Sequence, residues 1–151
     1  MQKKTKIYIE QPLGRFLSHT GRSFLSLLNT KLSHLDIDRS YYALLLIQAG
    51  EDGITQQDLA GLMDTDKVSV VRIIDYLSAK GYVKRAKNTS DRRKYSLMLT
   101  DKAKKAIPQI KNSLNEVTNI AFKGLNQYQI KEFYKTLNTI KNNLNESNSC
   151  L

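Results

Sequence analysis

Apolar residues recur at steps of three and four through most of this chain, the spacing that places them on one face of an α-helix. The pattern is longest in segment 13–32. Segment 39–49 is apolar on nearly all sides, which is typical of a buried helix. We expect helices over about 13–32, 39–49, 56–63, 66–81, 101–124 and 126–144, with Asp38 capping the second and a loose polar tail from Asn145.

The helix expected over 66–81 is the centre of the pattern. The helix before it starts at Thr55, and Asp58 follows three residues later, as in a capping box. Residues 64–65 interrupt the two helices with a tight turn, so the segment predicts a helix-turn-helix unit. The apolar residues of the second helix fall at helical spacing and predict a face directed at a core: Val70, Ile73, Ile74 and Leu77.

Two short segments after this helix have residues that favour strands. Segments 82–86 and 95–99 are separated by residues 87–94, which are basic and rich in turn formers. This pattern predicts a β-hairpin with a basic tip. Ile54 can add one short strand beside the hairpin, so we expect a mainly α fold with a small β-hairpin.

Positive charge is concentrated on the predicted hairpin. The chain has a formal net charge of +10, and its sequence pI is about 9.7. Between Lys80 and Lys94 there are seven Lys or Arg and one acid, Asp91, a net charge of +6 on roughly a tenth of the chain. A solvated surface does not require such clustering, so we expect a polyanionic partner, with nucleic acid as the leading candidate.

The surface of the 66–81 helix opposite its apolar stripe offers groups that can contact base edges. Arginine binds guanine through two hydrogen bonds, and apolar side chains contact the thymine methyl group. An ordinary solvated helix face, with Val68 and Val71 as tolerated surface valines, is the alternative. We expect contacts with DNA from Lys67, Val68, Ser69, Val71 and Arg72.

The hairpin tip and the start of the 56–63 helix are candidates for holding the phosphate backbone. A projecting basic hairpin suits the minor groove or its phosphates, although a merely solvated loop has the same composition. Residues at a helix N-terminus can donate to phosphate, but capping alone also accounts for these residues. The candidates are Arg92, Arg93 and Lys94 on the hairpin, and Thr55, Gln56 and Gln57 at the helix start.

Segments 66–85 and 90–100 together resemble the MarR family of winged helix-turn-helix transcription regulators. Asp91 and Arg93 match the Asp-x-Arg motif of the family's wing, immediately before a strand that ends in Leu-Thr. The resemblance extends from about Leu13 to Leu144. It implies that Asp91 orients Arg93.

The resemblance also implies an assembly and a function. It implies a homodimer that binds double-stranded DNA at a pseudo-palindromic operator and represses, or less often activates, transcription. We expect one MarR-type domain over 1–151, with a winged-helix part at 35–100 and helical dimerisation parts at 1–34 and 101–146. The apolar stripe of the last helix favours a dimer, because too little chain remains to cover it. The alternative is a winged-helix module that binds nucleic acid non-specifically or binds another protein.

Members of the family are commonly released from DNA by a small, often aromatic and anionic, ligand. The polar-tipped residues of the first two helices that we expect near such a ligand are His19, Arg22, Tyr41 and Tyr42. For Tyr41 and Tyr42 the favoured interpretation is that they are core residues with satisfied hydroxyl groups.

Other functional classes have little support in the sequence. Cys150 is the single cysteine, so no intrachain disulfide can form. His19 and His34 are too far apart on a helix to share a metal ion. No nucleophile triad, phosphate loop or apolar carboxylate pair is present, so we expect neither an enzyme nor a cofactor. No signal peptide or membrane span is recognisable, and we expect a cytoplasmic protein without a membrane partner.

Overall fold

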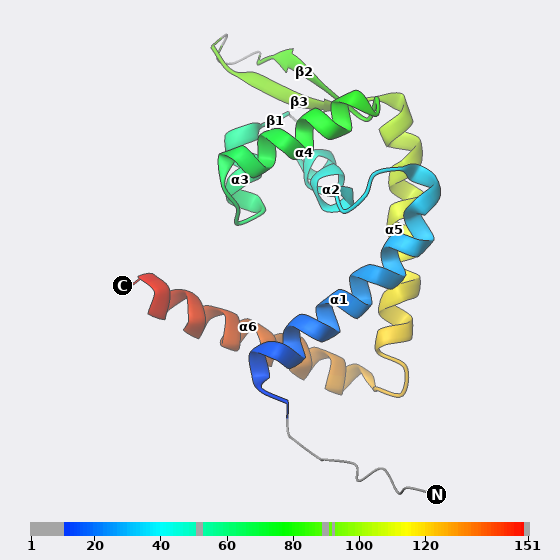
Figure 1. Ribbon diagram of the computed structural model, residues 1–151, viewed down its shortest axis with the longest axis vertical. Coiled ribbons are helices and arrows are strands. Elements are labelled where there is room, and N and C mark those ends of the chain that lie inside the picture. Colours follow the sequence, from blue (N-terminus) through cyan, green and yellow to red (C-terminus); the bar gives the residue numbers. More distant parts are fainter. Residues whose placement is uncertain (1–10, 51–52, 89–90, 92, 150–151) are drawn as a thin grey trace, which may run out of the picture. The chain divides into compact units, whose positions relative to one another are not determined.

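The computed structural model of the protein describes residues 11–50, 53–88, 91 and 93–149. The chain divides into two compact units, one up to Val117 and one from Thr118. The mainly α fold with a small antiparallel sheet confirms the expected fold class. In chain order the elements are α1 (Leu13–Leu32), the 3-10 helix η1 (Ser33–Leu35), α2 (Tyr41–Ala49), β1 (Ile54–Thr55), α3 (Gln56–Leu62), α4 (Lys67–Ala79), β2 (Val83–Lys87), β3 (Tyr95–Leu99), α5 (Asp101–Ala121) and α6 (Gln127–Ser149) (Figure 1).

Helices α3 and α4 form the expected helix-turn-helix unit. The hydroxyl group of Thr55 accepts from the backbone amide of Asp58 at 3.1 Å, and the Asp58 carboxylate accepts from the backbone amide of Thr55 at 2.9 Å. This is the predicted capping box. Asp66 caps α4 by accepting from the backbone amide of Ser69 at 2.8 Å. Asp64 lies in the turn with φ 52°, and this left-handed residue separates the two helices.

The three strands form one antiparallel sheet in the order β1-β3-β2. Strands β2 and β3 pair from Val83 opposite Leu99 to Lys87 opposite Tyr95, which confirms the hairpin. Ile54 pairs with Leu97, so the expected short third strand is present. In Figure 1 the hairpin extends beyond the helix-turn-helix unit, with its tip at the far end from α5.

The core of the first unit combines its helices with the sheet. The apolar stripe of α4 is directed into this core: Val70, Ile74 and Leu77 are fully buried, and the half-buried Ile73 packs against it. This confirms the predicted buried face of α4. The other largest fully buried side chains are Leu28 and Leu32 from α1, Ile37 from the connector after η1, Leu44 from α2, Leu59 from α3, Tyr82 just before β2, Leu97 from β3, and Ile107 and Ile110 from α5.

Two expectations about helix ends are wrong. Helix α2 begins at Tyr41 with Ser40 at its N-cap position, so Asp38 does not cap it; an N-cap residue usually has an extended backbone, whereas Asp38 has φ 46°. Helix α6 continues to Ser149 instead of ending near residue 144. No proline or glycine stops it, and the hydroxyl group of Ser147 donates to the carbonyl oxygen of Asn143 at 2.9 Å.

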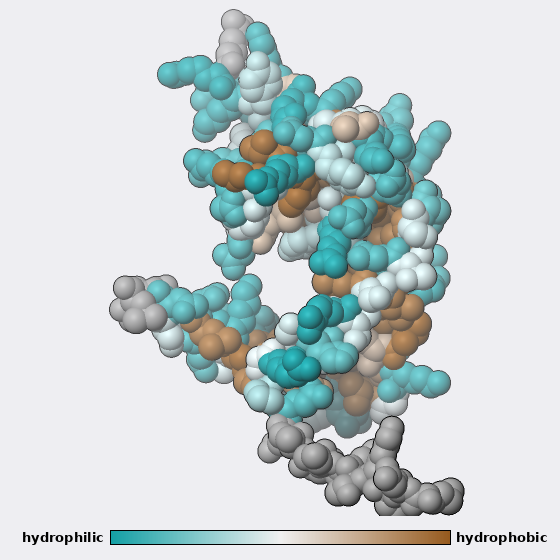
Figure 2. Space-filling view, in the orientation of Figure 1, coloured by the Kyte–Doolittle hydropathy of each residue, from teal (hydrophilic) through white to brown (hydrophobic). Residues whose placement is uncertain are grey.

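The second unit contains the end of α5 and all of α6. Asn126 caps α6, because its side-chain oxygen accepts from the backbone amide of Gln129 at 2.9 Å. Phe122, Phe133 and Tyr134 form edge-to-face contacts, with ring centroids 5.7 to 5.8 Å apart. Figure 2 shows apolar surface along α6. Five apolar residues of α6, each half-buried or exposed, recur at alternating steps of three and four, the spacing of a coiled-coil seam: Ile130, Phe133, Leu137, Ile140 and Leu144.

Candidate nucleic-acid interface

The outward face of α4 presents apolar and basic groups to solvent. Val68 is 62% exposed and Val71 is 41% exposed, and Lys67 and Arg72 are exposed beside them. Ser69 differs, because its hydroxyl group donates to the Asp66 carboxylate at 2.7 Å and it is half-buried. The arrangement leaves two valines and two cations available to a groove, with Ser69 partly engaged in capping.

Arg85 joins the helix-turn-helix unit to the hairpin. Its Nη2 donates to Asp75 Oδ1 of α4 at 2.7 Å, and its Nε donates to Gln56 Oε1 of α3 at 2.8 Å. One guanidinium group on β2 therefore connects three elements. Sequence reasoning counted Arg85 only as part of the positive charge and did not single out Asp75. Their separation of ten residues follows no helical or strand period, so no local signal predicts the pair.

The start of α3 faces the hairpin. A pocket of about 470 Å³ is lined by Thr55, Gln56, Gln57, Asp58, Lys94 and Tyr95. The structure thus brings the expected phosphate contacts of α3 together with Lys94. Thr55 and the oxygen of Gln56 already bind protein groups, as described above. Gln57 and Lys94 are exposed, and they are the members of this group best placed to meet a phosphate.

Asp91 organises the described part of the hairpin tip. Its Oδ1 accepts from the backbone amide of Arg93 at 3.0 Å and lies 3.8 Å from Arg93 Nε. The contact implied by the family resemblance is therefore present, although the Arg93 side chain is 96% exposed and the ion pair contributes little. Its carboxylate shapes the turn mainly through the backbone. Arg92, the third expected cation, lies outside the described residues.

Two carboxylates hold the N-termini of α3 and α4. Hydrogen bonds from the backbone amide and then the hydroxyl group of Thr55 lower the pKa of Asp58. The hydroxyl group and backbone amide of Ser69 lower the pKa of Asp66 in the same way. Both groups are therefore anionic at neutral pH. A carboxylate at a helix N-terminus also interacts favourably with the helix dipole, so these charges hold the unit in place.

Of the four residues expected near a ligand, the structure brings two together. His19 and Arg22 line an open cavity of about 570 Å³ along α1. An adjoining cavity of about 520 Å³ is lined by Arg22, Leu25, Ser26, Asn29, Thr30 and Arg39.

Tyr41 and Tyr42 line neither of these cavities. Tyr41 packs against the core, and burial raises its pKa, while Tyr42 is 45% exposed. Arg39 is the cation that sequence reasoning missed, because it was assigned to the helix rather than to the connector before it.

Among the residues that the structure describes, no cluster of three or more His, Cys, Asp or Glu side chains is arranged to hold a metal ion. Within the same residues, no helix combines the length and apolar character needed to cross a membrane.

Comparison with known proteins gives consistent matches. The MarR family model matches residues 35–94. The crystal structure of a MarR transcriptional regulator from Methanosarcina mazei is similar, with a TM-score of 0.76, 29% identity and coverage of 89% of this chain and 96% of that chain.

CouR from Rhodococcus jostii bound to p-coumaroyl-CoA has a TM-score of 0.77 and 26% identity, covering 86% of this chain and 92% of that chain. A MarR-family regulator from Listeria monocytogenes complexed with a 26mer DNA shares the fold, with a TM-score of 0.78, 20% identity and coverage of 91% and 92%. Residues 35–94 thus match the MarR family, and over most of its length the chain is similar to MarR-family winged-helix transcriptional regulators.

Proposed function

We propose that the protein is a sequence-specific regulator that binds double-stranded DNA as a homodimer and represses transcription from a pseudo-palindromic operator. The observation that carries the proposal is the position of the outward face of α4 next to a basic hairpin, with Arg85 connecting the two. A helix with exposed valines and arginine suits base edges, and exposed lysines beside it suit phosphates. The relative from Listeria monocytogenes, which shares this fold, is complexed with DNA.

The two parts of this interface have different roles in the proposal. Lys67, Val68, Val71 and Arg72 of α4 enter the major groove, where base pairs differ in their edges. Gln57 and Lys94, together with Arg92 and Arg93, hold the backbone or the adjacent minor groove and contribute mainly through charge. In the proposal, Asp91 stabilises the turn at the hairpin tip through its hydrogen bond with the backbone amide of Arg93.

The dimer is proposed to form through the helices outside 35–100. The seam of α6 has coiled-coil spacing, and Leu13, Phe16 and Leu17 of α1 are also exposed. A second copy of the chain can cover both surfaces, because identical stripes pair in a two-fold interface. A two-fold dimer presents two copies of α4 to successive major grooves. Segments 1–34 and 101–146 are therefore the proposed dimerisation parts, and the cytoplasm is the proposed location.

We further propose that an anionic, aromatic ligand binds beside α1 and weakens DNA binding. Arg22 and Arg39 line the same cavity, and two guanidinium groups favour a carboxylate or phosphate. Asn29 also lines this cavity, and within the described chain its buried Oδ1 has no hydrogen-bond partner. CouR, a relative, is bound to the anionic aromatic thioester p-coumaroyl-CoA. The cavity brings Arg22 together with Arg39, and Tyr41 and Tyr42 do not line it.

The test begins with selection of binding sites from the protein's own genome. The affinity for the selected site is then compared with that for a random duplex at several salt concentrations. A sequence-specific regulator binds the selected site roughly 10³-fold or more tightly, whereas a non-specific module binds both with similar affinity. Equal affinities would favour the alternative. Aromatic carboxylates are then added, and Arg39→Ala is expected to reduce their effect without changing the ligand-free affinity.

A further inference from the structure

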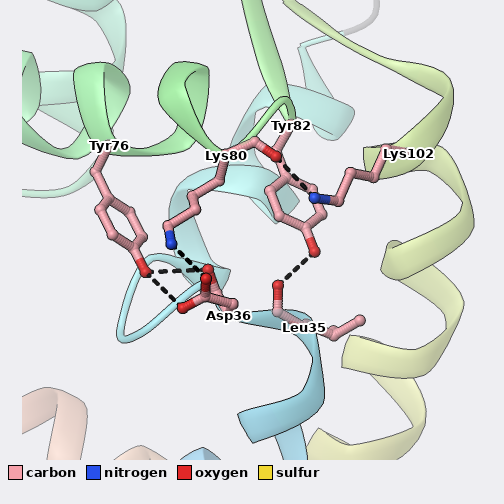
Figure 3. Close-up of polar contacts among 6 residues, drawn as sticks. All are labelled: Leu35, Asp36, Tyr76, Lys80, Tyr82 and Lys102. Carbon is pink, nitrogen blue, oxygen red and sulfur yellow. Dashed lines mark hydrogen bonds and ion pairs between the residues drawn. The ribbon is translucent and has the colours of Figure 1, made fainter.

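The last turn of α4 is held by the connector that follows η1 (Figure 3). Lys80, the C-cap residue directly after α4, forms an ion pair with the carboxylate of Asp36. The hydroxyl group of Tyr76 donates to the carbonyl oxygen of Asp36 at 3.0 Å and reaches its Oδ1 at 3.3 Å. Asp36 thus binds two side chains on successive turns of the helix, through both its backbone and its carboxylate.

Two further contacts fix the surroundings of this cluster. The buried hydroxyl group of Tyr82, just after α4, donates to the carbonyl oxygen of Leu35 at 2.5 Å. Lys102 of α5 donates to the carbonyl oxygen of Lys80 at 2.8 Å, and its ammonium group lies 4.4 Å from the ring centroid of Tyr82. A free carbonyl at the C-terminus of α4 is thereby satisfied by a cation, as helix ends favour.

Asp36 occupies the point where α1 is joined to α4. It follows η1 directly, and η1 follows α1 without a break. Its φ of 52° is in the left-handed region, so the connector turns sharply at this residue. Helix α1 is in turn joined to α5 by an ion pair between Lys31 and Glu116 at 2.6 Å. Asp36 therefore connects the C-terminal turn of α4 to the end of the α1–η1 segment.

The contacts of Asp36 contribute more to orientation than to stability. Its side chain is 67% exposed, and exposed ion pairs add little to the free energy of unfolding. The pKa shifts of the two partners agree in direction: the hydrogen bond from Lys80 lowers the pKa of Asp36, and the hydrogen bond to Asp36 raises the pKa of Lys80. Both groups are therefore charged at neutral pH. The buried stripe of α4 holds the helix in the core but leaves its tilt about that stripe to contacts such as these.

We propose that Asp36 is a positioning residue for base recognition: through Tyr76 and Lys80 it fixes the orientation in which α4 presents Val68, Val71 and Arg72. The inference rests on the proposed function, in which α4 contacts base edges. Base contacts require accurate placement of the helix, whereas phosphate contacts tolerate small rotations. Loss of the Asp36 contacts is therefore expected to reduce discrimination between sequences more than it reduces overall affinity.

The test compares Asp36→Asn with Asp38→Asn. Asp38 lies two residues later, also in the left-handed region with φ 46°, and it makes none of the hydrogen bonds described for Asp36. Asparagine tolerates this conformation, and both substitutions remove one negative charge, so they match in backbone strain and in charge. The measured quantity is the ratio of affinities for the selected operator and a random duplex, with the midpoint of thermal unfolding measured alongside.

Asp36→Asn is expected to lower this ratio by about threefold to tenfold, and Asp38→Asn is expected to leave it unchanged. Tyr76→Phe should lower the ratio in the same direction without a change in charge. The double variant Asp36→Asn, Tyr76→Phe should lose less than the sum of the single losses, because both act through one contact.

Equal ratios for Asp36→Asn and Asp38→Asn, whether or not the unfolding midpoint changes, would overturn the inference and leave the proposed function in place. A native ratio near one would instead overturn the proposed function, and the inference would fall with it. The native ratio is measured first, so a failure of the proposed function is recognised before any variant is made. A failure of the inference is then recognised from the variants alone.

Discussion

Arg85 and Asp75 form an ion pair between β2 and α4, with 2.7 Å between Nη2 and Oδ1. Lys80 is likewise paired with Asp36. Two of the cations in the segment from Lys80 to Lys94 therefore neutralise acids of the protein itself. The charge available to a phosphate backbone is smaller than the net charge of the segment indicates, and the internal pairs contribute to geometry instead.

The first prediction concerns the strength of this pair. The side chains of Arg85 and Asp75 are 34% and 60% exposed, so we expect a coupling energy of about 0.2–1 kcal/mol in a double-mutant cycle of Arg85→Ala and Asp75→Ala, measured by urea unfolding. The pair of Lys104 and Asp101, at 3.9 Å and more exposed, serves as a control and should show less coupling. A coupling energy well above this range would show that the pair is a main source of stability.

The second prediction distinguishes the contribution of α4 to DNA binding from that of the hairpin. Arg72→Ala should cost roughly 1–3 kcal/mol at one symmetric pair of operator positions and relax the preference there. Lys94→Ala, like Arg92→Ala, should weaken operator and random duplexes by similar factors and make the salt dependence shallower by about one unit per subunit. Lys111→Ala on α5 removes the same charge elsewhere and should do neither. Binding is measured on single-base variants at several salt concentrations; an equal loss on all sequences for Arg72→Ala contradicts the assignment.

The third prediction contrasts two faces of α4. Ile74 is fully buried, so Ile74→Ala should lower the free energy of unfolding by about 2–5 kcal/mol. Val71 is 41% exposed, so Val71→Ala should change it by less than about 0.5 kcal/mol while weakening binding to the operator. Chemical unfolding and DNA titration of both variants provide the comparison. Unchanged operator affinity for Val71→Ala would indicate that this valine is only a tolerated surface residue.

Sequence patterns predicted the helix-turn-helix unit and hairpin because these features are local. The stripe of Val70, Ile74 and Leu77 follows the helical period, and the capping box of Thr55 and Asp58 spans three residues. Each signal is contained within the element that it specifies. The seven cations near the hairpin likewise required only counting.

Long-range polar contacts were not predictable in this way. Asp36 and Lys80 are 44 residues apart, and nothing in either local sequence identifies the partner. The left-handed conformation of Asp38 also depends on the path of the connector rather than on a local capping signal, and for that reason the start of α2 was misplaced. The grouping of Arg39 with Arg22 depends on the same path.

The fourth prediction concerns pH. The folded protein lowers the pKa of Asp58 and Asp66 below the usual value for aspartate, so their stabilising effect is fully present above about pH 4 and is lost as the pH falls through the lower folded pKa values. The double variant Asp58→Asn, Asp66→Asn keeps oxygen acceptors at both caps but cannot bind these protons. Its free energy of unfolding should therefore decrease less than that of the native protein between about pH 5 and pH 3. Parallel decreases would exclude this contribution.

The fifth prediction concerns assembly. Ile140 lies on the α6 seam, and Asn142 lies on the exposed part of the same helix. A charge within an apolar seam is costly, so Ile140→Asp should dissociate the proposed dimer, whereas Asn142→Asp introduces the same group and should leave it intact. Sedimentation velocity over a range of concentrations measures the outcome. A dimer that survives Ile140→Asp would place the interface on other residues.

Two residues of the connector between η1 and α2, Asp36 and Asp38, should differ in which substitutions evolution tolerates. A left-handed backbone disfavours most side chains, so selection for stability alone would favour glycine at residues 36 and 38 alike. At residue 38 such a replacement should be neutral for recognition. At residue 36 the same replacement would relieve local strain but remove the carboxylate that binds Lys80. Selection for stability and selection for sequence discrimination therefore favour different residues at position 36, whereas at position 38 they do not conflict.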